Sequence, residues 1–356
     1  MATPSAIRKL DDDAAWSGVA ASPRARIRRL TLADFRSYER LDLALDGRPV
    51  ALSGPNGAGK TNALEAISLL GPGRGLRHAR LEELPRLDGD GGWAVSIRLE
   101  TAGDEIALGV GADGARDADR RRCRIDGGTA SGPSAFADHL RLVWLTPAQD
   151  RLFLEGAGER RRFLDRMAMA LDPAIARVSS SYETAMRQRQ RLLDERSRDE
   201  AWLAALELQM AEAGVALAAA RRDMAGALLA AAVEDEDAAF PAADIALEGD
   251  IEAALAYQPA ADVEEEFLAR LKSNRRIDAE AGRALIGPHR SDMLVAHRAK
   301  GRPARLCSTG EQKALLIGLV LANARALSLK GDGAPLILLL DEIAAHLDED
   351  RRAALF

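Results

Sequence analysis

Apolar and polar residues alternate in several short segments between residues 26 and 145. The alternation is strict from Trp93 to Leu99 and from Ile106 to Val110, with Gly103 and Asp104 between the two segments. A period of two predicts strands that bury one face, and strands joined by short turns predict antiparallel pairing. A continuous apolar run predicts a strand that is buried on both faces. We therefore expect strands at 30–32, 41–45, 50–52, 93–99, 106–110, 122–125 and 142–145.

From residue 157 the pattern changes to one that is typical of helices. Residues 157–233 contain a single proline and are rich in Ala, Leu, Arg and Glu. Apolar positions such as Leu203, Leu206 and Met210 recur at helical spacing, and Asp172 with Pro173 supplies a helix start signal. We expect helices at about 157–171, 173–198, 200–233, 263–280 and 312–326, a short strand at 245–247 and a buried strand at 336–340.

The segment from Gly54 to Thr61 has the form G-x-x-x-x-G-K-[ST], which is the phosphate-binding P-loop. An apolar run precedes it and a helical pattern follows it, so backbone N–H groups should converge on one point. This context argues against a chance match. We expect Lys60 to reach the β- and γ-phosphates of a nucleotide and Thr61 to ligate Mg²⁺. The expected nucleotide contacts are Gly54, Pro55, Asn56, Gly57, Ala58, Gly59, Lys60, Thr61 and Asn62.

The apolar strand expected at 336–340 runs directly into Asp341 and Glu342. Such a strand carries its acids to the carboxyl edge of a sheet, where the ligand sites of α/β proteins lie. We expect Asp341 to hold Mg²⁺ and Glu342 to act as the catalytic base on the attacking water. The pattern is weak alone, but together with a P-loop it predicts a nucleoside triphosphatase.

Residues 308–312, Ser-Thr-Gly-Glu-Gln, open the helix expected at 312–326. A hydroxyl and a glycine at a helix start predict an anion site. The alternative is an ordinary helix cap with Glu311 at the third position. Because the P-loop already supplies one phosphate site, a second fits the nucleotide of another copy. Two copies about a two-fold axis would enclose two ATP molecules, with Ser308, Gly310 and Gln312 contacting the partner's nucleotide.

Three further residues are candidates around the nucleotide. Gln149 follows the strand at 142–145, and we expect it to act in catalysis as a sensor of the γ-phosphate and the metal. A surface amide is the alternative for Gln149. Arg36 lies between two expected strands, and we expect it to face the nucleotide, with a plain connecting turn as the alternative. Asp348 is expected to contact the opposite subunit.

The net charge of the 356 residues is −6, so any DNA-binding surface has to be a local patch. Six of the 49 basic residues are lysine and the rest are arginine, which fits a coding bias as well as it fits DNA binding. The arginine clusters at 120–124, 160–162 and 187–191 are therefore candidate DNA contacts, with solvated helix faces as the equal alternative.

The spacing of the cysteines and the hydropathy of the chain indicate the cellular compartment in which the protein acts. Cys123 and Cys307 lie far apart and lack metal-ligand spacing, which fits reduced thiols in a cytosolic protein. We find no apolar run of the length of a membrane span and no signal-peptide core at the N-terminus. We therefore expect a cytoplasmic protein without a membrane partner.

In combination, these motifs resemble the RecF family of SMC-like, ABC-type ATPases. The resemblance extends from about residue 26 to the end of the chain, and its specificity lies in the combination of motifs. The matching segments are 27–30, 34–38, 54–65, 160–165, 287–292, 308–312 and 339–348.

The resemblance implies an α/β fold: an ABC-type P-loop ATPase head, with a mixed sheet and an antiparallel β subdomain, plus an inserted α-helical lobe. We expect a loose tail at 1–24, the head at 25–155 and 281–356, and the helical lobe at 156–280. The tail is additional to the family pattern. The chain ends at Phe356, before the strand that carries the switch contact in the family, so we expect an incomplete C-terminus.

The resemblance further implies a slow, Mg²⁺-dependent ATPase that dimerises on ATP. RecF-like proteins bind duplex DNA near single-strand gaps without sequence specificity. They act with RecR and RecO and help to load RecA. ATP hydrolysis returns the DNA-bound dimer to its starting state. The implied cofactors are ATP and Mg²⁺, and the implied partners are DNA, RecR, RecO, RecA and a second copy of the chain.

Three other classes of P-loop protein compete with this interpretation. The ATPase subunit of a transporter keeps its P-loop and signature turn much closer together, whereas 247 residues separate Thr61 from Ser308. A P-loop kinase needs a substrate lid and has no signature turn. An SMC-type tether needs a far longer run of heptads than the expected helices supply.

Overall fold

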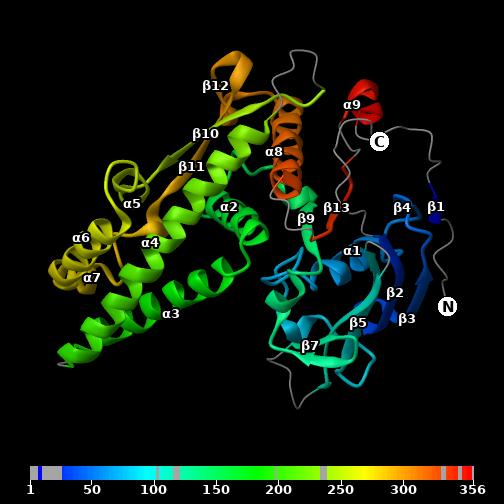
Figure 1. The fold of residues 1–356 in the computed structure, drawn as a ribbon, viewed down its shortest axis with the longest axis horizontal. Coiled ribbons are helices and arrows are strands. Elements are labelled where there is room, and N and C mark those ends of the chain that lie inside the picture. Colours follow the sequence, from blue (N-terminus) through cyan, green and yellow to red (C-terminus); the bar gives the residue numbers. More distant parts are fainter. Residues whose placement is uncertain are drawn as a thin grey trace. The chain divides into compact units, whose positions relative to one another are not determined.

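The structure, a computed structural model, describes residues 7–9, 26–101, 104–114, 121–196, 199–232, 239–329, 334–343 and 347–354. The chain divides into two compact units. The first comprises Met1–Pro147 and Leu327–Phe356, and the second comprises Ala148–Ala326, which runs from green to orange in Figure 1. Each unit has a buried apolar core of its own.

A six-stranded antiparallel sheet with the order β3-β2-β5-β6-β7-β8 dominates the first unit. The alternation seen in the sequence is confirmed, because Leu30, Leu32, Val95 and Ile97 are buried in its core. The strands are β2 (Arg26–Phe35), β3 (Tyr38–Ala44), β5 (Trp93–Thr101), β6 (Asp104–Ala112), β7 (Arg122–Ile125) and β8 (Gly128–Ala130).

The elements around the P-loop come from distant parts of the chain. The strand β9 (Arg141–Leu145) is buried throughout and pairs in parallel with β13 (Leu336–Leu340), so Leu340 lies opposite Leu145. The first unit thus contains both parallel and antiparallel pairing, but in separate sheets rather than in the one mixed sheet that was expected. Its helices are α1 (Lys60–Ser68) and α9 (Glu349–Ala353), with single 3-10 turns at Leu81–Glu83, Pro133–Phe136 and Pro147–Gln149.

One expectation about this region is wrong, and a second, the loose tail at 1–24, stays a prediction because the structure describes only three of its residues. The strand before the P-loop, β4 (Val50–Leu52), was expected to be buried, but Val50 is 37% exposed and the other two residues are half-buried. The tail was expected to be loose, yet β1 (Ile7–Lys9) pairs antiparallel with β4. A three-residue apolar run does not show which strand will cover it, and the rest of the tail lies outside the described residues.

The second unit combines helices with a small antiparallel sheet of order β10-β11-β12. Of the five expected helices, those at 157–171, 173–198, 200–233 and 312–326 are confirmed within a few residues. The helix expected at 263–280 is divided at Asn274, and α5 was not expected. The elements are α2 (Ala157–Leu171), α3 (Ile175–Asp194), α4 (Glu200–Ala231), β10 (Ala243–Glu248), α5 (Asp250–Ala254), α6 (Ala260–Ser273), α7 (Arg275–Ala281), β11 (Asp292–His297), β12 (Arg302–Pro303) and α8 (Thr309–Leu329), with 3-10 turns at Pro288–Arg290, Arg298–Lys300 and Ala304–Leu306.

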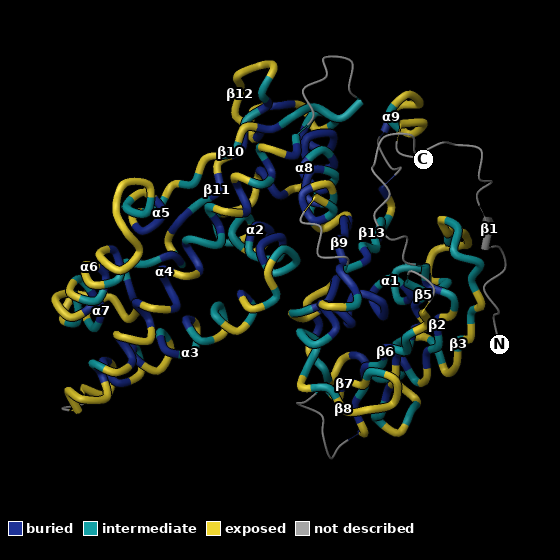
Figure 2. Tube along the Cα trace, in the orientation of Figure 1, coloured by how far each residue is buried: buried dark blue, intermediate teal, exposed yellow. Residues whose placement is uncertain are grey.

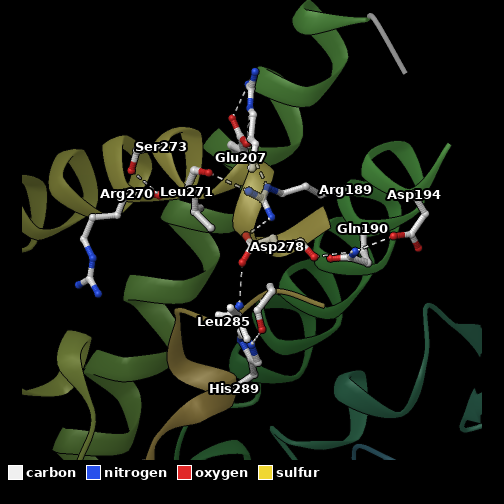
Figure 3. Close-up of polar contacts among 12 residues, drawn as sticks. Arg189, Gln190, Asp194, Glu207, Arg270, Leu271, Ser273, Asp278, Leu285 and His289 are labelled. Carbon is white, nitrogen blue, oxygen red and sulfur yellow. Dashed lines mark hydrogen bonds and ion pairs between the residues drawn. The ribbon is translucent and has the colours of Figure 1, made fainter. Parts of the chain in front are cut away.

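A buried ion network connects α3, α4, α6 and α7 of this unit (Figure 3). Arg189 on α3 is 1% exposed and donates to Glu207 Oε1 at 3.0 Å, to Asp278 Oδ2 at 2.7 Å and to the Leu271 carbonyl at 2.7 Å. Both carboxylates are fully buried. Arg275 makes a second, two-pronged pair with Glu207. Buried charges are tolerated only with such complete partnering.

The division into units differs from the expected domains at both boundaries. Residues 281–326, which the sequence assigns to the head, pack with the helices of the second unit. The assignment of 25–155 and 281–356 to one functional head, with a lobe at 156–280, therefore stays a proposal.

Two helices, α4 and α8, are long and apolar enough to cross a membrane by length and composition, which the sequence reading did not anticipate. Within their apolar windows, 50% and 67% of the residues are buried inside the protein. Figure 2 shows this burial along much of α8. Core helices pass the same test, so neither helix is evidence of a membrane span.

Candidate functional site

The P-loop connects β4 to α1 through glycines in backbone conformations that side chains disfavour. The φ angle is +148° at Gly54, +83° at Gly57 and +92° at Gly59. Lys60 Nζ donates to the carbonyl oxygens of Gly54 at 2.8 Å and Pro55 at 2.9 Å. The ammonium group therefore lies over the loop, where it can exchange these oxygens for those of a phosphate.

Gly59 approaches Tyr38 too closely to carry a side chain. A Cβ atom built on Gly59 would lie 2.6 Å from the Tyr38 hydroxyl oxygen. Burial raises the pKa of this hydroxyl, so Tyr38 stays neutral. The sequence offered Tyr38 only as part of a matching segment, and its packing on the P-loop could not be read from the chain.

The P-loop and the acidic strand end meet directly. Thr61 Oγ1 donates to Asp341 Oδ1 at 3.2 Å across 280 positions of sequence. The Asp341 N–H donates to the Leu145 carbonyl at 2.9 Å, which continues the parallel pairing and fixes the end of β13. The structure therefore brings together the two residues that were predicted separately as metal ligands.

The oxygens of Thr61 and Asp341 suit Mg²⁺, which prefers a few protein ligands alongside phosphates and water. Burial raises the pKa of Asp341 and the charge of Glu342 adds to this, while the Thr61 hydrogen bond and the charges of Arg77 and Lys60 oppose it. Among the described residues no group of three or more His, Cys, Asp or Glu could hold a metal by itself. Thr61 and Asp341 would therefore leave the other coordination positions of Mg²⁺ to phosphate and water.

Glu342 takes a backbone conformation that is uncommon for a residue with a side chain. Its φ angle is +49°, in the left-handed region, and the residue is exposed. Conformations of this kind persist only where the surroundings impose them, and they gather at functional sites. The left-handed turn redirects the chain directly after Asp341.

Arg36 has a partner other than the expected nucleotide. Its guanidinium donates twice to Glu65, at 3.0 and 2.7 Å, and once to the Glu83 carbonyl at 2.6 Å. Glu65 on α1 is 1% exposed and also pairs with Arg77 at 3.1 Å. Asn62 accepts from Arg77 and donates to Ser37. Arg36 thus anchors the β2–β3 turn to the P-loop helix, and its contact with a nucleotide stays a prediction.

The turn at Ser308 forms the helix cap that the sequence left open as an alternative. The Ser308 N–H and hydroxyl donate to Glu311 Oε2 at 2.7 and 2.9 Å. Lys300 also donates to the Glu311 carboxylate, and together these bonds lower the pKa of Glu311 to about 2. A Cβ built on Gly310 meets no atom within 4 Å, so that side of the turn is open. The Ser308 N–H and hydroxyl are thus engaged by Glu311, and the anion site at this turn stays a prediction.

The remaining predicted site residues lie as follows. Gln312 is buried and its amide donates to the Cys307 carbonyl at 2.8 Å. Gln149 is half-buried in the 3-10 turn after β9. Asp348 caps α9, where its side chain accepts from the Arg351 N–H at 2.8 Å. The segment 344–346 lies outside the described residues. The nucleotide roles of these residues stay predictions.

Most of the arginines that were candidate DNA contacts have partners within their own unit. Arg160 pairs with Asp292, Arg122 with Asp113, Arg162 with Glu159 and Arg191 with Glu195. Arg189 is buried, which neither the DNA-binding nor the solvated-face interpretation anticipated. Arg124 is exposed. Arg120 lies outside the described residues. The cysteines Cys123 and Cys307 are free and buried.

The fold and the P-loop with its acidic strand define the class of this protein as an ABC-type P-loop ATPase. The family model of the RecF/RecN/SMC N terminal domain matches residues 26–356. A relative from Mesorhizobium japonicum is 52% identical over 334 residues, which cover 94% of this chain and 88% of the relative. One from Rhizobium meliloti is 49% identical over 92% of this chain and 87% of its own. Both relatives are called DNA replication and repair protein RecF, and the chain belongs to the RecF family.

Two solved structures show the same fold at lower sequence identity. Structures of the recombination mediator protein RecF in the RecFOR pathway, with ATPrS and with ATP, match with TM-scores of 0.79 and 0.77. Each is 21% identical and covers 93% of this chain, and 89% and 88% of the respective structure is covered. They confirm the ABC-type ATPase fold that the sequence predicted.

Proposed function

We propose that this protein is an ATP-dependent DNA-binding ATPase of recombinational repair and replication restart. The observation that carries the proposal is the contact between Thr61 of the P-loop and Asp341 at the end of β13. A hydroxyl on a phosphate-binding helix beside a carboxylate on an adjacent strand end is the arrangement that places Mg²⁺ between protein and nucleotide.

The remaining residues support slow, Mg²⁺-dependent hydrolysis. The loop from Gly54 to Asn62 holds the phosphates, and Lys60 neutralises charge on the γ-phosphate. Glu342 accepts the proton of the attacking water, and Gln149 senses the γ-phosphate and the metal. When bound, Mg²⁺ would draw charge from the phosphates and orient them against this base.

The open face of the Ser308 turn supports an arrangement in which two copies share ATP. The turn has helix N–H groups on a face that is open at Gly310, and the Ser308 hydroxyl would exchange its bond to Glu311 for one to a phosphate. In the proposed dimer, Ser308, Gly310 and Gln312 contact the nucleotide of the partner, and Asp348 contacts the partner chain. Loss of the γ-phosphate then removes a shared contact and opens the dimer.

The family supplies the biological setting of the proposal. The curated relatives are named for DNA replication and repair, and the solved relatives for the RecFOR pathway. We infer that the chain acts in the cytoplasm with RecR and RecO on duplex DNA beside single-strand gaps, and promotes RecA loading. Phosphate contacts by arginine would make this binding salt-dependent and independent of sequence.

Light scattering on the protein with ATP, Mg²⁺ and a gapped duplex tests the proposal. We expect a dimer with ATP and Mg²⁺, a monomer without nucleotide, and a complex on gapped DNA that weakens as salt is raised. A protein that stays monomeric with ATP and Mg²⁺, and leaves the gapped duplex free at low salt, would contradict it.

Replacing Lys60 with arginine should weaken ATP binding by roughly 10–100-fold, the equivalent of one lost charge-assisted contact. A planar guanidinium cannot occupy the position that a point-like ammonium fills inside a closed loop. Titration with a fluorescent ATP analogue measures the change, and Lys272→Arg on the exposed face of α6 is the matched control. Equal affinity in Lys60→Arg would remove Lys60 from the phosphate site.

Replacing Ser308 with arginine should abolish ATP-driven dimerisation while ATP binding by the monomer persists. The bulky cation fills the face of the turn that would receive the partner's nucleotide, whereas the P-loop of the same chain is untouched. Ser273→Arg, on an exposed position of α6, is the control for the substitution itself. Loss of ATP binding by monomeric Ser308→Arg would refute a role toward the partner.

A further inference from the structure

Two of the matching sequence segments, 160–165 and 287–292, have no part in the nucleotide chemistry described above. The structure brings them together inside the second unit. The first lies on α2, and the second is the turn that leads into β11. We name the place where they meet the clamp and define it by Arg160, Asp165, Arg221, Ser291 and Asp292.

Arg221 on α4 is the centre of the clamp and is 3% exposed. It donates to both carboxylate oxygens of Asp165, at 2.6 and 3.0 Å, and to the Pro288 carbonyl at 2.6 Å and Ser291 Oγ at 2.8 Å. Burial opposes its charge, but the hydrogen bonds and charges of Asp165 and Glu252 together outweigh burial and raise the pKa of Arg221. One guanidinium thus joins α2, α4 and the turn before β11.

Arg160 and Arg161 on α2 bind Asp292 and Ser291, where the turn enters β11. Arg160 makes a two-pronged pair with Asp292, at 2.8 and 2.7 Å. Arg161 donates to the Ser291 carbonyl at 2.6 Å. Paired, parallel bonds of this kind fix orientation as well as distance. The first residue of β11, Asp292, is therefore held at a fixed position and orientation relative to α2.

The small sheet leads from the clamp to the Ser308 turn. Asp292 begins β11 opposite Glu248, and the far end of the strand pairs His297 with Arg302 of β12. Figure 1 shows β10 and β11 side by side along this path. From β12 the chain enters the 3-10 turn Ala304–Leu306, and Cys307 N–H closes that turn on the Ala304 carbonyl at 3.1 Å. Ser308 follows at once.

The helix after Ser308 is also set against the start of this sheet. A Cβ built on Gly318 of α8 would lie 2.7 Å from the Pro241 carbonyl oxygen, just before β10. The helix α8 therefore packs against the chain just before β10 so closely that Gly318 has no room for a side chain. A hydrogen-bonded sheet is stiffer than a loop, so this path can carry a displacement at the clamp to the Ser308 turn.

We propose that the clamp is a positioning device, in which Arg160 and Arg221 set the place of the Ser308 turn through the sheet β10-β11-β12. This deepens the proposed function, since the turn is where the partner's nucleotide would bind. None of the clamp residues is among the expected nucleotide contacts. They join the helices α2 and α4 to the turn before β11. A ligand that moves these helices therefore changes the affinity of the Ser308 turn for ATP.

Hydrogen–deuterium exchange on the nucleotide-free protein tests the positioning step by itself. In Arg160→Gln we expect exchange at residues 304–312 to rise by about tenfold or more, which corresponds to the loss of a charge-assisted pair. Asp292→Asn, which removes the same pair from the other side, should give the same result, and the double variant should add little. Unchanged exchange at 304–312 in both single variants would overturn the proposal.

Dimerisation supplies the second readout. Arg160→Gln should raise the ATP concentration needed for half-maximal dimerisation by about tenfold, while the affinity of the monomer for ATP stays unchanged. Arg275→Gln is the matched control, because it removes a two-pronged pair with Glu207 in the same unit but away from the sheet. If Arg275→Gln impairs dimerisation equally at equal loss of thermal stability, the effect is general and the proposal is wrong.

The two experiments separate this inference from the proposed function. A wild-type protein that never dimerises with ATP would refute the shared nucleotide, yet the exchange measurement would still decide the clamp. A wild-type protein that dimerises, with normal exchange and dimerisation in Arg160→Gln and Asp292→Asn, would refute the clamp alone.

Discussion

Glu342→Gln is expected to slow ATP hydrolysis by roughly 10²–10⁴-fold, the usual contribution of a general base. The amide keeps the size of the side chain but cannot accept the proton of the attacking water. Because the Thr61 and Asp341 side chains stay in contact, ATP and Mg²⁺ should still bind, so the nucleotide-held dimer should accumulate. Phosphate release at saturating ATP, with light scattering on the same sample, measures both effects.

Two controls make the result specific to Glu342. Glu349→Gln removes an exposed carboxylate from α9 in the same unit and should leave hydrolysis unchanged. Asp341→Asn should instead weaken the response to Mg²⁺, since it removes a proposed metal ligand. Phosphate release by Glu342→Gln at the wild-type rate would exclude Glu342 as the base.

The parts of the site that lie close together in sequence could be predicted from it. The P-loop is a local motif, and its glycines and helix start are set by short-range backbone geometry. Asp341 follows an apolar run whose length alone predicts a strand, and β13 forms there. The strand was expected to be buried, but only Leu339 is, and its other four residues are half-buried. The period of two at residues 93–110 gave β5 and β6 within a few residues, because one face of each strand is buried.

The partners of charged residues could not be predicted, because they come from far along the chain. Arg189 and Arg191 are two positions apart in one arginine cluster, yet Arg189 is buried with Asp278 and Arg191 pairs with Glu195 at the surface. In a chain with many arginines, identity and spacing do not separate these cases. The clue lies in the helical face, since Tyr182, Ala185, Arg189 and Leu192 share the buried side of α3.

The same limit applies to Arg36 and to the strand before the P-loop. The sequence placed Arg36 beside the nucleotide because of chain order, but its partner Glu65 lies on the other side of the P-loop, 29 positions away. A buried acid in a helix of mostly small apolar residues is a signal for such a partner. The strand β4 pairs with residues of the tail. This is a tertiary contact, so it cannot be predicted from the three residues of β4 alone.

The buried network around Arg189 should be the most sensitive point of the second unit. Arg189→Met is expected to lower its free energy of unfolding by about 3–5 kcal/mol, the usual cost of breaking a buried ion pair from one side. The variant leaves Asp278 buried without a cation and the Leu271 carbonyl without its donor, while Glu207 keeps Arg275 (Figure 3). Urea unfolding followed by far-ultraviolet circular dichroism measures the loss.

The control for charge removal is Arg276→Gln on α7. Arg276 is 80% exposed and pairs with Glu280 one helical turn away, so its loss should cost no more than about 0.5 kcal/mol. Because domains of this size are stable by only about 5–15 kcal/mol, Arg189→Met should leave a large unfolded fraction in moderate urea. Equal unfolding midpoints for Arg189→Met and Arg276→Gln would contradict the buried network.

The cost of Arg189→Met should come mainly from the charge left behind rather than from the lost attraction. A carboxylate removed from water has a large desolvation cost, and only a nearby cation offsets it. Adding Asp278→Leu to Arg189→Met should therefore recover part of the lost stability, although the double variant has fewer bonds than the single one. A double variant less stable than Arg189→Met would show instead that Asp278 contributes mainly through the Leu285 N–H, which donates to its Oδ1 at 3.0 Å.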